Sequence, residues 1–319
     1  PELKTAPELT LYDGYAHIKD PNLSGPCKAA CPLHVPVQAY VQKIAKGEFK
    51  EAFDLITSKG ALQGACAYVC THPCEDACVR GSIDAPVKIR ELKRFVLDYG
   101  KQQGWKPAWA KAEPNGHKVA VIGAGPCGLS CAAELIKGGY DVTVFEKEAT
   151  AGGALRYAIP DYAGHKALLD EEVENLKDCG VKFVFGKSVS DIAELKAEGF
   201  EKVFAAVGAN KKAAAPMEGE DAREFLYKVN CGEKPAVSER VVVIGGGFAA
   251  VDAARCAVRL GAKNVTVLNP SGFSKRSGDA EALNEAKEEG VVLFDKVQIT
   301  EIAPDAVYFT KDGADMRIK

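Results

Sequence analysis

The sequence predicts an α+α/β protein, in which a cysteine-rich α-helical domain precedes two Rossmann-like, doubly wound domains. Three observations support this fold class. Six of the eleven cysteines lie between residues 27 and 78, among segments with helical periodicity. Two short apolar runs, residues 118–122 and 240–244, each lead into a glycine-rich turn. A helical segment and a further apolar run follow each turn, which is the βαβ order of dinucleotide-binding folds.

Length and composition narrow the class of protein. A chain of 319 residues has room for two or three domains. The net charge of −3 gives no support for a nucleic-acid partner. No apolar run reaches about 18 residues, so we expect no membrane insertion. The first twenty residues lack the pattern of a signal peptide, and we therefore expect a cytoplasmic protein.

The N-terminal third is predicted to be helical. Residues 1–26 are rich in Pro, Gly and polar residues and are expected to form an extended arm. Residues 27–116 are expected to form an α-helical domain and its linker. Apolar residues repeat at helical spacing over 36–47, 48–58 and 87–99, and Gly47 ends the first of these helices.

Two βαβ units of nearly identical layout follow. Their strands are continuous apolar runs, as expected for parallel strands that are buried on both faces. The first unit opens a domain over residues 117–238, and the second opens a domain over residues 239–319. The expected elements are a strand at 118–122, a helix at 128–137 and a strand at 141–145, then a strand at 240–244, a helix at 250–260 and a strand at 264–268.

The first glycine-rich turn reads Gly123-Ala124-Gly125-Pro126-Cys127-Gly128. In this fingerprint the first glycine permits a tight turn, the second lets the backbone approach a pyrophosphate, and the third lets the helix pack on the strand. The free N–H groups of the helix N-terminus then face the phosphates. Glu146, at the end of the next strand, suits the ribose hydroxyls. We therefore expect a dinucleotide here.

The second turn reads Gly245-Gly246-Gly247-Phe248-Ala249-Ala250, with alanine in the third fingerprint position. Asn269 takes the place of Glu146, and an amide is neither the carboxylate that favours NAD nor the arginine that favours NADP. The missing arginine favours NADH over NADPH. Lys275 and Arg276 offer an alternative contact for a 2′-phosphate, or they are solvated surface charges.

The clustered cysteines are expected to bind metal. Cys27 and Cys31 precede a run in which Cys66, Cys70, Cys74 and Cys78 follow at equal spacing. Thiolates hold iron–sulfur clusters, and a Cys-Pro step such as Cys31-Pro32 commonly ends a run of ligands. Six cysteines are too many for one tetrahedral zinc. Zinc, reduced core thiols and a disulfide framework remain alternatives to a [4Fe–4S] cluster.

The order of these motifs resembles the glutamate synthase small subunit family, which includes the N-terminal half of dihydropyrimidine dehydrogenase. The Gly152-Gly153 pair, and Ala158-Ile159-Pro160 after it, add to the resemblance. It implies a helical iron–sulfur domain, an FAD domain that begins at residue 117, and an NAD(P)H domain inserted into it. In that family NAD(P)H reduces FAD, and the clusters pass electrons on to a separate catalytic site.

The resemblance also implies roles for single residues. Cys27 and Cys78 match ligands of one family cluster, and Cys31, Cys70 and Cys74 match three ligands of another. Cys66 matches a position that is not usually a ligand, and we expect one cubane drawn from the six cysteines. A Gly-Asp segment near the flavin lies beyond Lys319 in the family, so the last domain is expected to be incomplete here. Further positions expected at the cofactors are Ala124, Pro126, Lys147, Gly152, Gly153, Leu155 and Gly208.

The sequence therefore predicts an electron-transfer oxidoreductase subunit. Electrons would pass between NAD(H) or NADP(H), FAD and a [4Fe–4S] cluster, and to or from other subunits of a complex. The alternative is a non-catalytic scaffold that binds FAD and a cluster and has a degenerate nicotinamide site. We expect the cofactors to supply the chemistry and the protein to supply positioning, so no separate catalytic residue is expected.

Overall fold

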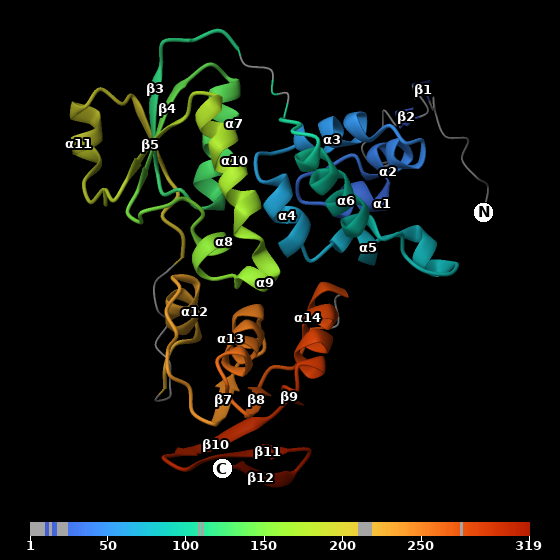
Figure 1. Ribbon diagram of the computed structural model, residues 1–319, viewed down its shortest axis with the longest axis vertical. Helices are drawn as coiled ribbons and strands as arrows, with labels where there is room; N and C mark the ends of the chain where they lie inside the picture. The colour runs from blue at the N-terminus through green and yellow to red at the C-terminus, as the bar shows by residue number, and fades with distance from the viewer. Residues whose placement is uncertain are drawn as a thin grey trace. The chain divides into compact units, whose positions relative to one another are not determined.

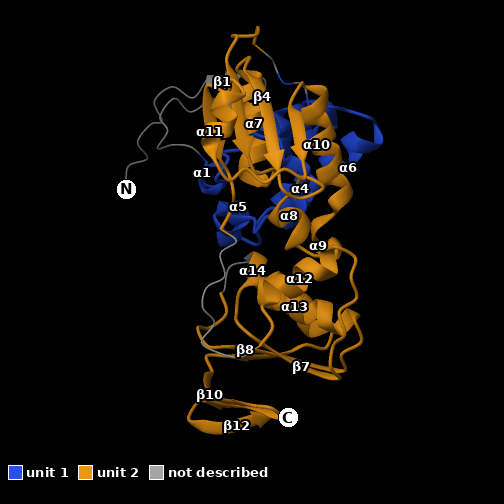
Figure 2. Cartoon of the chain, turned by 90° about the vertical axis from the view of Figure 1, so that its left-hand side faces the viewer, with its two compact units in different colours: residues 1–111 blue, residues 112–319 orange. Residues whose placement is uncertain are grey.

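The computed structural model describes residues 10–12, 15–17, 25–107, 109, 112–209, 219–274 and 277–319. The chain divides into two compact units, residues 1–111 and 112–319 (Figure 2). Where the extended arm was expected, β1 (Thr10–Tyr12) and β2 (Tyr15–His17) pair antiparallel. The other residues of the arm up to 24 lie outside the described ranges.

The first unit is helical, as predicted. Of its helices, α2, α3 and α6 correspond to the three that the periodicity predicted. The short helices α4 and α5 were not predicted, because with seven and four residues they are too short to show an apolar repeat. The elements are α1 (Pro26–Ala30), α2 (Val37–Ala45), α3 (Phe49–Thr57), α4 (Gln63–Val69), α5 (Pro73–Asp76), the 3₁₀ helix η2 (Val79–Ser82) and α6 (Ile89–Gln102).

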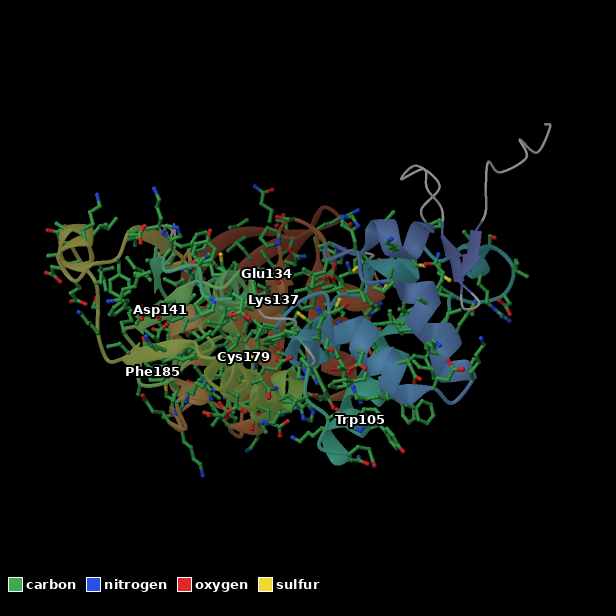
Figure 3. All side chains as sticks on the ribbon, turned by 90° about the horizontal axis from the view of Figure 1, so that it is seen from above. Trp105, Glu134, Lys137, Asp141, Cys179 and Phe185 are labelled. Atoms are coloured by element: carbon green, nitrogen blue, oxygen red, sulfur yellow. The ribbon has the colours of Figure 1, made fainter. Side chains whose placement is uncertain are left out.

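The core of this unit extends into the linker that the sequence predicts over residues 105–116. Tyr40, Phe53 and Val96 are buried at its centre. The Trp105 ring packs edge-on against Phe53 and Tyr99, at centroid distances of 5.7 and 5.6 Å (Figure 3). Trp105, the first residue of the expected linker, therefore belongs to the helical core. The Pro and Gly content of the linker did not predict this.

The second unit begins with a parallel sheet of order β5-β4-β3-β6. Helices α7 and α10 lie on one side of it and α11 on the other (Figure 1), as in a doubly wound domain. Glu134 and Lys137, close together on α7 in Figure 3, form an ion pair of 2.7 Å. The elements are β3 (Lys118–Ile122), α7 (Pro126–Lys137), β4 (Asp141–Glu146), α10 (Lys166–Asp178), β5 (Lys182–Phe185), α11 (Ile192–Ala197) and β6 (Lys202–Ala205).

The second dinucleotide fold has three parallel strands of order β7-β8-β9. An antiparallel sheet of order β10-β11-β12 follows, and its Phe309 is buried against Leu268 and Val297. This sheet was not predicted from the sequence. The elements are β7 (Arg240–Ile244), α13 (Phe248–Arg259), β8 (Asn264–Asn269), α14 (Ser277–Glu288), β9 (Val292–Asp295), β10 (Gln298–Ala303), β11 (Ala306–Lys311) and β12 (Ala314–Ile318).

The predicted fold class is confirmed: a helical domain precedes two Rossmann-like parallel sheets. Strands β3 and β7 have the predicted bounds, and β4 and β8 each run one residue further. None of the helices within the described ranges is long and apolar enough to cross a membrane.

Two short helices of the first dinucleotide fold, α8 (Ala154–Tyr157) and α9 (Asp161–Gly164), lie between β4 and α10, and α12 (Ala222–Asn230) lies between the two folds along the chain. Tyr162 on α9 donates its hydroxyl hydrogen to Asp252 Oδ1 on α13, with an O–O distance of 2.9 Å. The guanidinium carbons of Arg255 and Arg259 lie 4.4 and 4.0 Å from the centroid of the Tyr162 ring. One aromatic side chain of the first fold is thus held by three charged side chains of the second.

Asp252 is the titrating group of this contact. Burial is the main cause that raises the pKa of Asp252 to about 6, although the Tyr162 hydroxyl and Arg255 act in the opposite direction. Because the pKa is higher in the folded chain than in the unfolded chain, folding favours the protonated carboxyl. The contribution of Asp252 to stability is therefore complete below about pH 4 and is lost as the pH rises through about 6.

We expect an Asp252→Asn variant to gain stability relative to the native chain as the pH rises. The amide oxygen can still accept the Tyr162 hydrogen bond and cannot ionise, and each pKa unit is worth about 1.4 kcal/mol. Thermal unfolding at several pH values between 4 and 7.5 measures this difference. Asp315→Asn, at an exposed position on β12, is the control and should follow the native profile. Parallel profiles for Asp252→Asn and the native chain would contradict the expectation.

Candidate nucleotide-binding turns and cysteine cluster

The turn between β3 and α7 requires glycine at two positions for folding alone. Gly123 has a φ of +101°, and a Cβ there would lie 2.4 Å from the carbonyl oxygen of Ala206. A Cβ on Gly128 would lie 1.9 Å from the carbonyl oxygen of Gly123. Gly125 differs, since the nearest atom to its Cβ would be Gly153 Cα at 3.8 Å. Its backbone is open to a ligand, as the fingerprint predicts for the second glycine.

The Gly152-Gly153 pair lies against this turn. The Gly152 N–H donates to the carbonyl oxygen of Ala124 at 2.8 Å. A Cβ on Gly153, which has a φ of +51°, would lie 2.7 Å from Gly125 Cα. Two glycine motifs that are far apart in the sequence therefore form one surface of bare backbone, on which a pyrophosphate can be held by N–H groups.

The Glu146 side chain accepts hydrogen bonds from the backbone of the first turn and of the residues after β4. Its side chain is buried at the end of β4, where Oε2 accepts the Ala124 N–H at 2.7 Å and Oε1 accepts the Glu148 N–H at 2.9 Å. A carboxylate has about four acceptor positions, so both oxygens can still accept ribose hydroxyls. This is the position that the spacing predicted.

The other positions expected at this site lie around the turn. Pro126 is the first residue of α7, where a missing N–H costs nothing. Lys147 follows Glu146 and pairs with Glu148 at 3.3 Å. Leu155 is half-buried on α8, and Gly208 follows β6 with a φ of +73°.

The second turn repeats the backbone of the first. The Gly245 N–H donates to the carbonyl oxygen of Leu268 at 2.9 Å, as the Gly123 N–H donates to that of Phe145 at 2.7 Å. Gly247 caps α13 with extended backbone angles, as Gly125 caps α7, and a Cβ on Gly247 would meet nothing within 4 Å in the described structure. A second dinucleotide can therefore approach Gly247.

Side chains distinguish the second turn from the first. Ala250, in the third fingerprint position, is buried and its N–H donates to the carbonyl oxygen of Gly247 at 3.0 Å. Asn269 ends β8 in the place of Glu146, and its side chain is 2% exposed. A Cβ on Gly246 would lie 2.2 Å from Asn269 Nδ2, so glycine is needed beside this amide. Lys275 and Arg276, the alternative phosphate contacts, lie outside the described residues.

Three cysteines of the helical unit, Cys27, Cys31 and Cys74, lie near Tyr40, a residue that was not predicted to belong to a site. Tyr40 is 1% exposed, and burial, followed by negative charge on Cys74, Cys31 and Cys27, raises the pKa of its hydroxyl. Its hydroxyl donates to the carbonyl oxygen of Ile89 at 3.4 Å. The phenol ring therefore packs where cysteines of α1 and α5 meet.

Two groups of thiols lie close enough to raise the pKa values of their members: Cys74 with Cys70 and Cys31, and Cys27 with Cys78 and Cys31. Burial, followed by negative charge on Cys70, Glu75 and Cys31, raises the pKa of the Cys74 thiol to about 12. Burial also raises the pKa of the Cys27 thiol, and negative charge on Cys78 and Cys31 acts in the same direction. Thiols that resist ionisation together are stabilised as thiolates when a cation binds them.

The donor set fits iron by its chemistry. All eleven cysteines are free thiols, so the predicted alternative of a disulfide framework is not observed. The His72 N–H donates to Cys70 Sγ at 3.3 Å, a contact that tunes cluster sulfurs in iron–sulfur proteins. Cys66 lies one turn earlier on α4, where its carbonyl oxygen accepts the Cys70 N–H. Within the described ranges, no three Cys, His, Asp or Glu side chains stand in metal-binding geometry.

Comparison with family models divides the chain in the same way. Residues 23–105 match the model described as dihydropyrimidine dehydrogenase domain II, 4Fe-4S cluster. Residues 117–319 match the model described as pyridine nucleotide-disulphide oxidoreductase. The resemblance on which the sequence prediction rested is thereby confirmed.

Several curated proteins are similar over most of this chain. NADP(+)-dependent formate dehydrogenase subunit beta of Moorella thermoacetica is 34% identical, over 89% of this chain and 45% of that protein. NADPH-Fe(3+) oxidoreductase subunit beta of Geobacter sulfurreducens is 34% identical, over 88% of this chain and 44% of that protein. NAD-dependent dihydropyrimidine dehydrogenase subunit PreT of Escherichia coli is 32% identical, over 85% of this chain and 68% of that protein. This chain therefore spans less than half the length of the first two.

Solved structures share the fold. The chain matches a 2-naphthoyl-CoA reductase with a TM-score of 0.55 and 24% identity, over 92% of this chain and 41% of that chain. It matches histamine dehydrogenase from Rhizobium sp. 4-9 with a TM-score of 0.55 and 19% identity, over 87% of this chain and 43% of that chain. Both are similar in fold.

Gly125 and Gly128 of the first turn should respond differently to alanine. Gly128→Ala places a Cβ 1.9 Å from a carbonyl oxygen, so α7 must move away from β3, and overpacking of this kind costs about 1–3 kcal/mol. Gly125→Ala has room and should cost less than about 1 kcal/mol, the loss of a favourable helix cap. Urea unfolding of both variants measures this. Equal destabilisation would mean that the open space at Gly125 is absent in solution.

Proposed function

Since the chain belongs to the pyridine nucleotide-disulphide oxidoreductase family, with a dihydropyrimidine dehydrogenase-type iron–sulfur domain before it, we propose that it is an electron-transfer oxidoreductase subunit. In this proposal NAD(P)H, FAD and a [4Fe–4S] cluster exchange electrons with partner subunits. The observation that carries the proposal is the pair of dinucleotide turns with matching backbones and different side chains. Two similar relatives are named as beta subunits, which supports partner subunits.

The first turn is proposed as the FAD site. It has the buried carboxylate of Glu146 and the added backbone surface of Gly152-Gly153. The residues proposed to hold FAD are Gly123, Ala124, Gly125, Pro126, Gly128, Glu146, Lys147, Gly152, Gly153, Leu155 and Gly208. The second turn is proposed as the nicotinamide site, through Gly245, Gly246, Gly247, Ala250 and Asn269.

The helical unit is proposed to hold a [4Fe–4S] cluster with ligands drawn from Cys27, Cys31, Cys66, Cys70, Cys74 and Cys78. FAD accepts a hydride and releases electrons singly, and a cluster carries single electrons onward. The protein contributes the positions of these groups: glycine backbone for the pyrophosphates, Glu146 for a ribose, and buried thiols for iron. Free cysteines throughout the chain support a cytoplasmic location, where thiols stay reduced.

Gly125→Ala and Gly247→Ala form a matched pair of variants, because both glycines cap a helix and both have room for a Cβ. Gly125→Ala should remain folded and purify without flavin, since its methyl group occupies the space of the pyrophosphate. Gly247→Ala should keep its flavin, which NAD(P)H should no longer bleach. Flavin content and stopped-flow bleaching measure the two effects.

Two outcomes would contradict this assignment of the turns. Stoichiometric flavin in Gly125→Ala would mean that FAD is held elsewhere. Loss of flavin in Gly247→Ala, with Gly125→Ala unaffected, would exchange the two sites. A native chain that holds flavin which neither NADH nor NADPH bleaches would favour the scaffold alternative.

Anaerobically purified protein should contain iron and acid-labile sulfide, each about four per chain for one cubane. Cys74→Ser should lower both, because Cys74 is the buried thiol beside Cys70 and Cys31. Cys179→Ser, outside the helical unit, is the matched control and should leave both unchanged. Stoichiometric zinc without sulfide in the native chain would replace the cluster with a structural zinc site.

A further inference from the structure

Helix α12 contacts both dinucleotide folds through neighbouring residues. Leu226 is fully buried and packs against Ala253 and Cys256 on α13 of the second fold. The next side chain, Tyr227, stacks on Tyr157 of α8 in the first fold, with ring centroids 5.3 Å apart and an interplanar angle of 29°. A helix that is anchored on the second fold therefore places an aromatic ring on the first.

The Tyr227 hydroxyl also reaches the segment that follows β4. It donates to Glu148 Oε2 at 3.1 Å. Burial, followed by this hydrogen bond and the negative charge of Glu148, raises the pKa of the Tyr227 hydroxyl, so the hydroxyl stays protonated as the donor. The Glu148 N–H donates in turn to Glu146 Oε1 at 2.9 Å. Tyr227 is thus linked through Glu148 to the carboxylate that is proposed to bind the FAD ribose.

Tyr157, on which Tyr227 stacks, is linked to the glycine pair beside the first turn. Its N–H donates to the carbonyl oxygen of Gly153 at 2.9 Å. Its hydroxyl lies 2.9 Å from Thr150 Oγ1, within hydrogen-bonding distance. Asn230, also on α12, donates from Nδ2 to the Tyr157 carbonyl oxygen at 3.2 Å. Helix α12 therefore holds both α8 and the segment 147–150, and these two are also bonded to each other.

The segment 147–150 has little packing of its own. Lys147, Ala149 and Thr150 are exposed, and Glu148 is half-buried. Ordering such a segment costs conformational entropy. If contacts within the protein already fix the segment, a ligand that needs it ordered binds without meeting that cost. Tyr227 can therefore favour a ligand at the first turn without touching it.

We propose that Tyr227 is a positioning residue for FAD, which holds Glu148 and α8 in the arrangement that binds the cofactor. This inference rests on the proposed function, which places FAD at the first turn. Tyr227 lies outside both glycine fingerprints, and its helix packs on the second fold. The second fold thus contributes to the cofactor site of the first.

Direct binding of FAD to the full chain, freed of its flavin, tests the proposal by calorimetry. Tyr227→Phe keeps the ring and loses the hydroxyl, and it should bind FAD about tenfold more weakly, which corresponds to about 1.4 kcal/mol. Tyr227→Leu loses the stacked ring as well and should bind FAD more weakly still. Glu148→Gln keeps an acceptor for the hydroxyl and should lose less affinity than Glu148→Ala. Tyr308→Phe, on the antiparallel sheet, is the matched control and should bind FAD as the native chain does.

Urea unfolding of the flavin-free variants separates positioning from folding. Tyr227 is 39% exposed, so its replacement by Phe should leave the unfolding midpoint close to native while the affinity for FAD falls. The double variant Tyr227→Phe/Glu148→Ala should bind FAD no more weakly than Glu148→Ala alone, because the two side chains act through one hydrogen bond.

The two possible failures can be distinguished. Native affinity for FAD in Tyr227→Phe and Tyr227→Leu, or additive losses in the double variant, would overturn the role of Tyr227 and leave the proposed FAD site standing. If Tyr227→Leu does not fold, Tyr227→Phe and the double variant decide. A native chain that does not bind FAD, or an affinity that Gly125→Ala leaves unchanged, would instead overturn the proposed function.

Discussion

The first nucleotide site depends on backbone lying against backbone with no side chain between. At Gly123, Gly128 and Gly153 a single Cβ would fall within 3 Å of main-chain atoms of a neighbouring segment. These contacts bring the end of β3, the start of α7 and the Gly152-Gly153 pair together. N–H groups can be concentrated on a phosphate only where side chains do not separate them, so the packing that folds the turn also prepares it for an anion.

The second site has the same backbone constraint with two changes. Its backbone follows that of the first turn, but Gly246 replaces Ala124 and an amide replaces the carboxylate behind it. The two changes belong together, because the Asn269 side chain occupies the space of a Cβ at Gly246. A duplicated turn can therefore acquire a different ligand through paired changes beside the backbone, while its hydrogen-bonded frame stays the same.

How far the sequence predicted this molecule depended on the kind of signal. Strands 118–122 and 240–244 were placed correctly because buried parallel strands are continuous apolar runs that end at glycine. Alignment of the two apolar strands placed Glu146 and Asn269 at equivalent positions, and the strand register confirms the equivalence. The burial of Asn269 and the direction of its amide could not be predicted, because they depend on the Ser271 N–H and on the space above Gly246.

Other features left weaker signals in the sequence. Helices α4 and α5 are too short to show an apolar repeat, and their buried residues are mostly small or polar. Tyr40 is buried within the helix predicted over residues 36–47, but nothing in its sequence neighbours indicates that three thiols lie near it. The contact between Tyr162 and Asp252 joins residues 90 positions apart, and no local pattern reports such a pair.

That contact bears on how such chains can be recombined. Tyr162 belongs to the first dinucleotide fold, yet its ring is covered by two guanidinium groups of the second, and Arg255 is in turn held by Glu285 and Glu289. A second fold cut out on its own would expose one face of both arginines and leave Asp252 without its tyrosine. The two nucleotide-binding halves are therefore not independent modules. A chimaera between relatives should exchange α9 and α13 together, because Tyr162 on α9 contacts Asp252, Arg255 and Arg259 on α13.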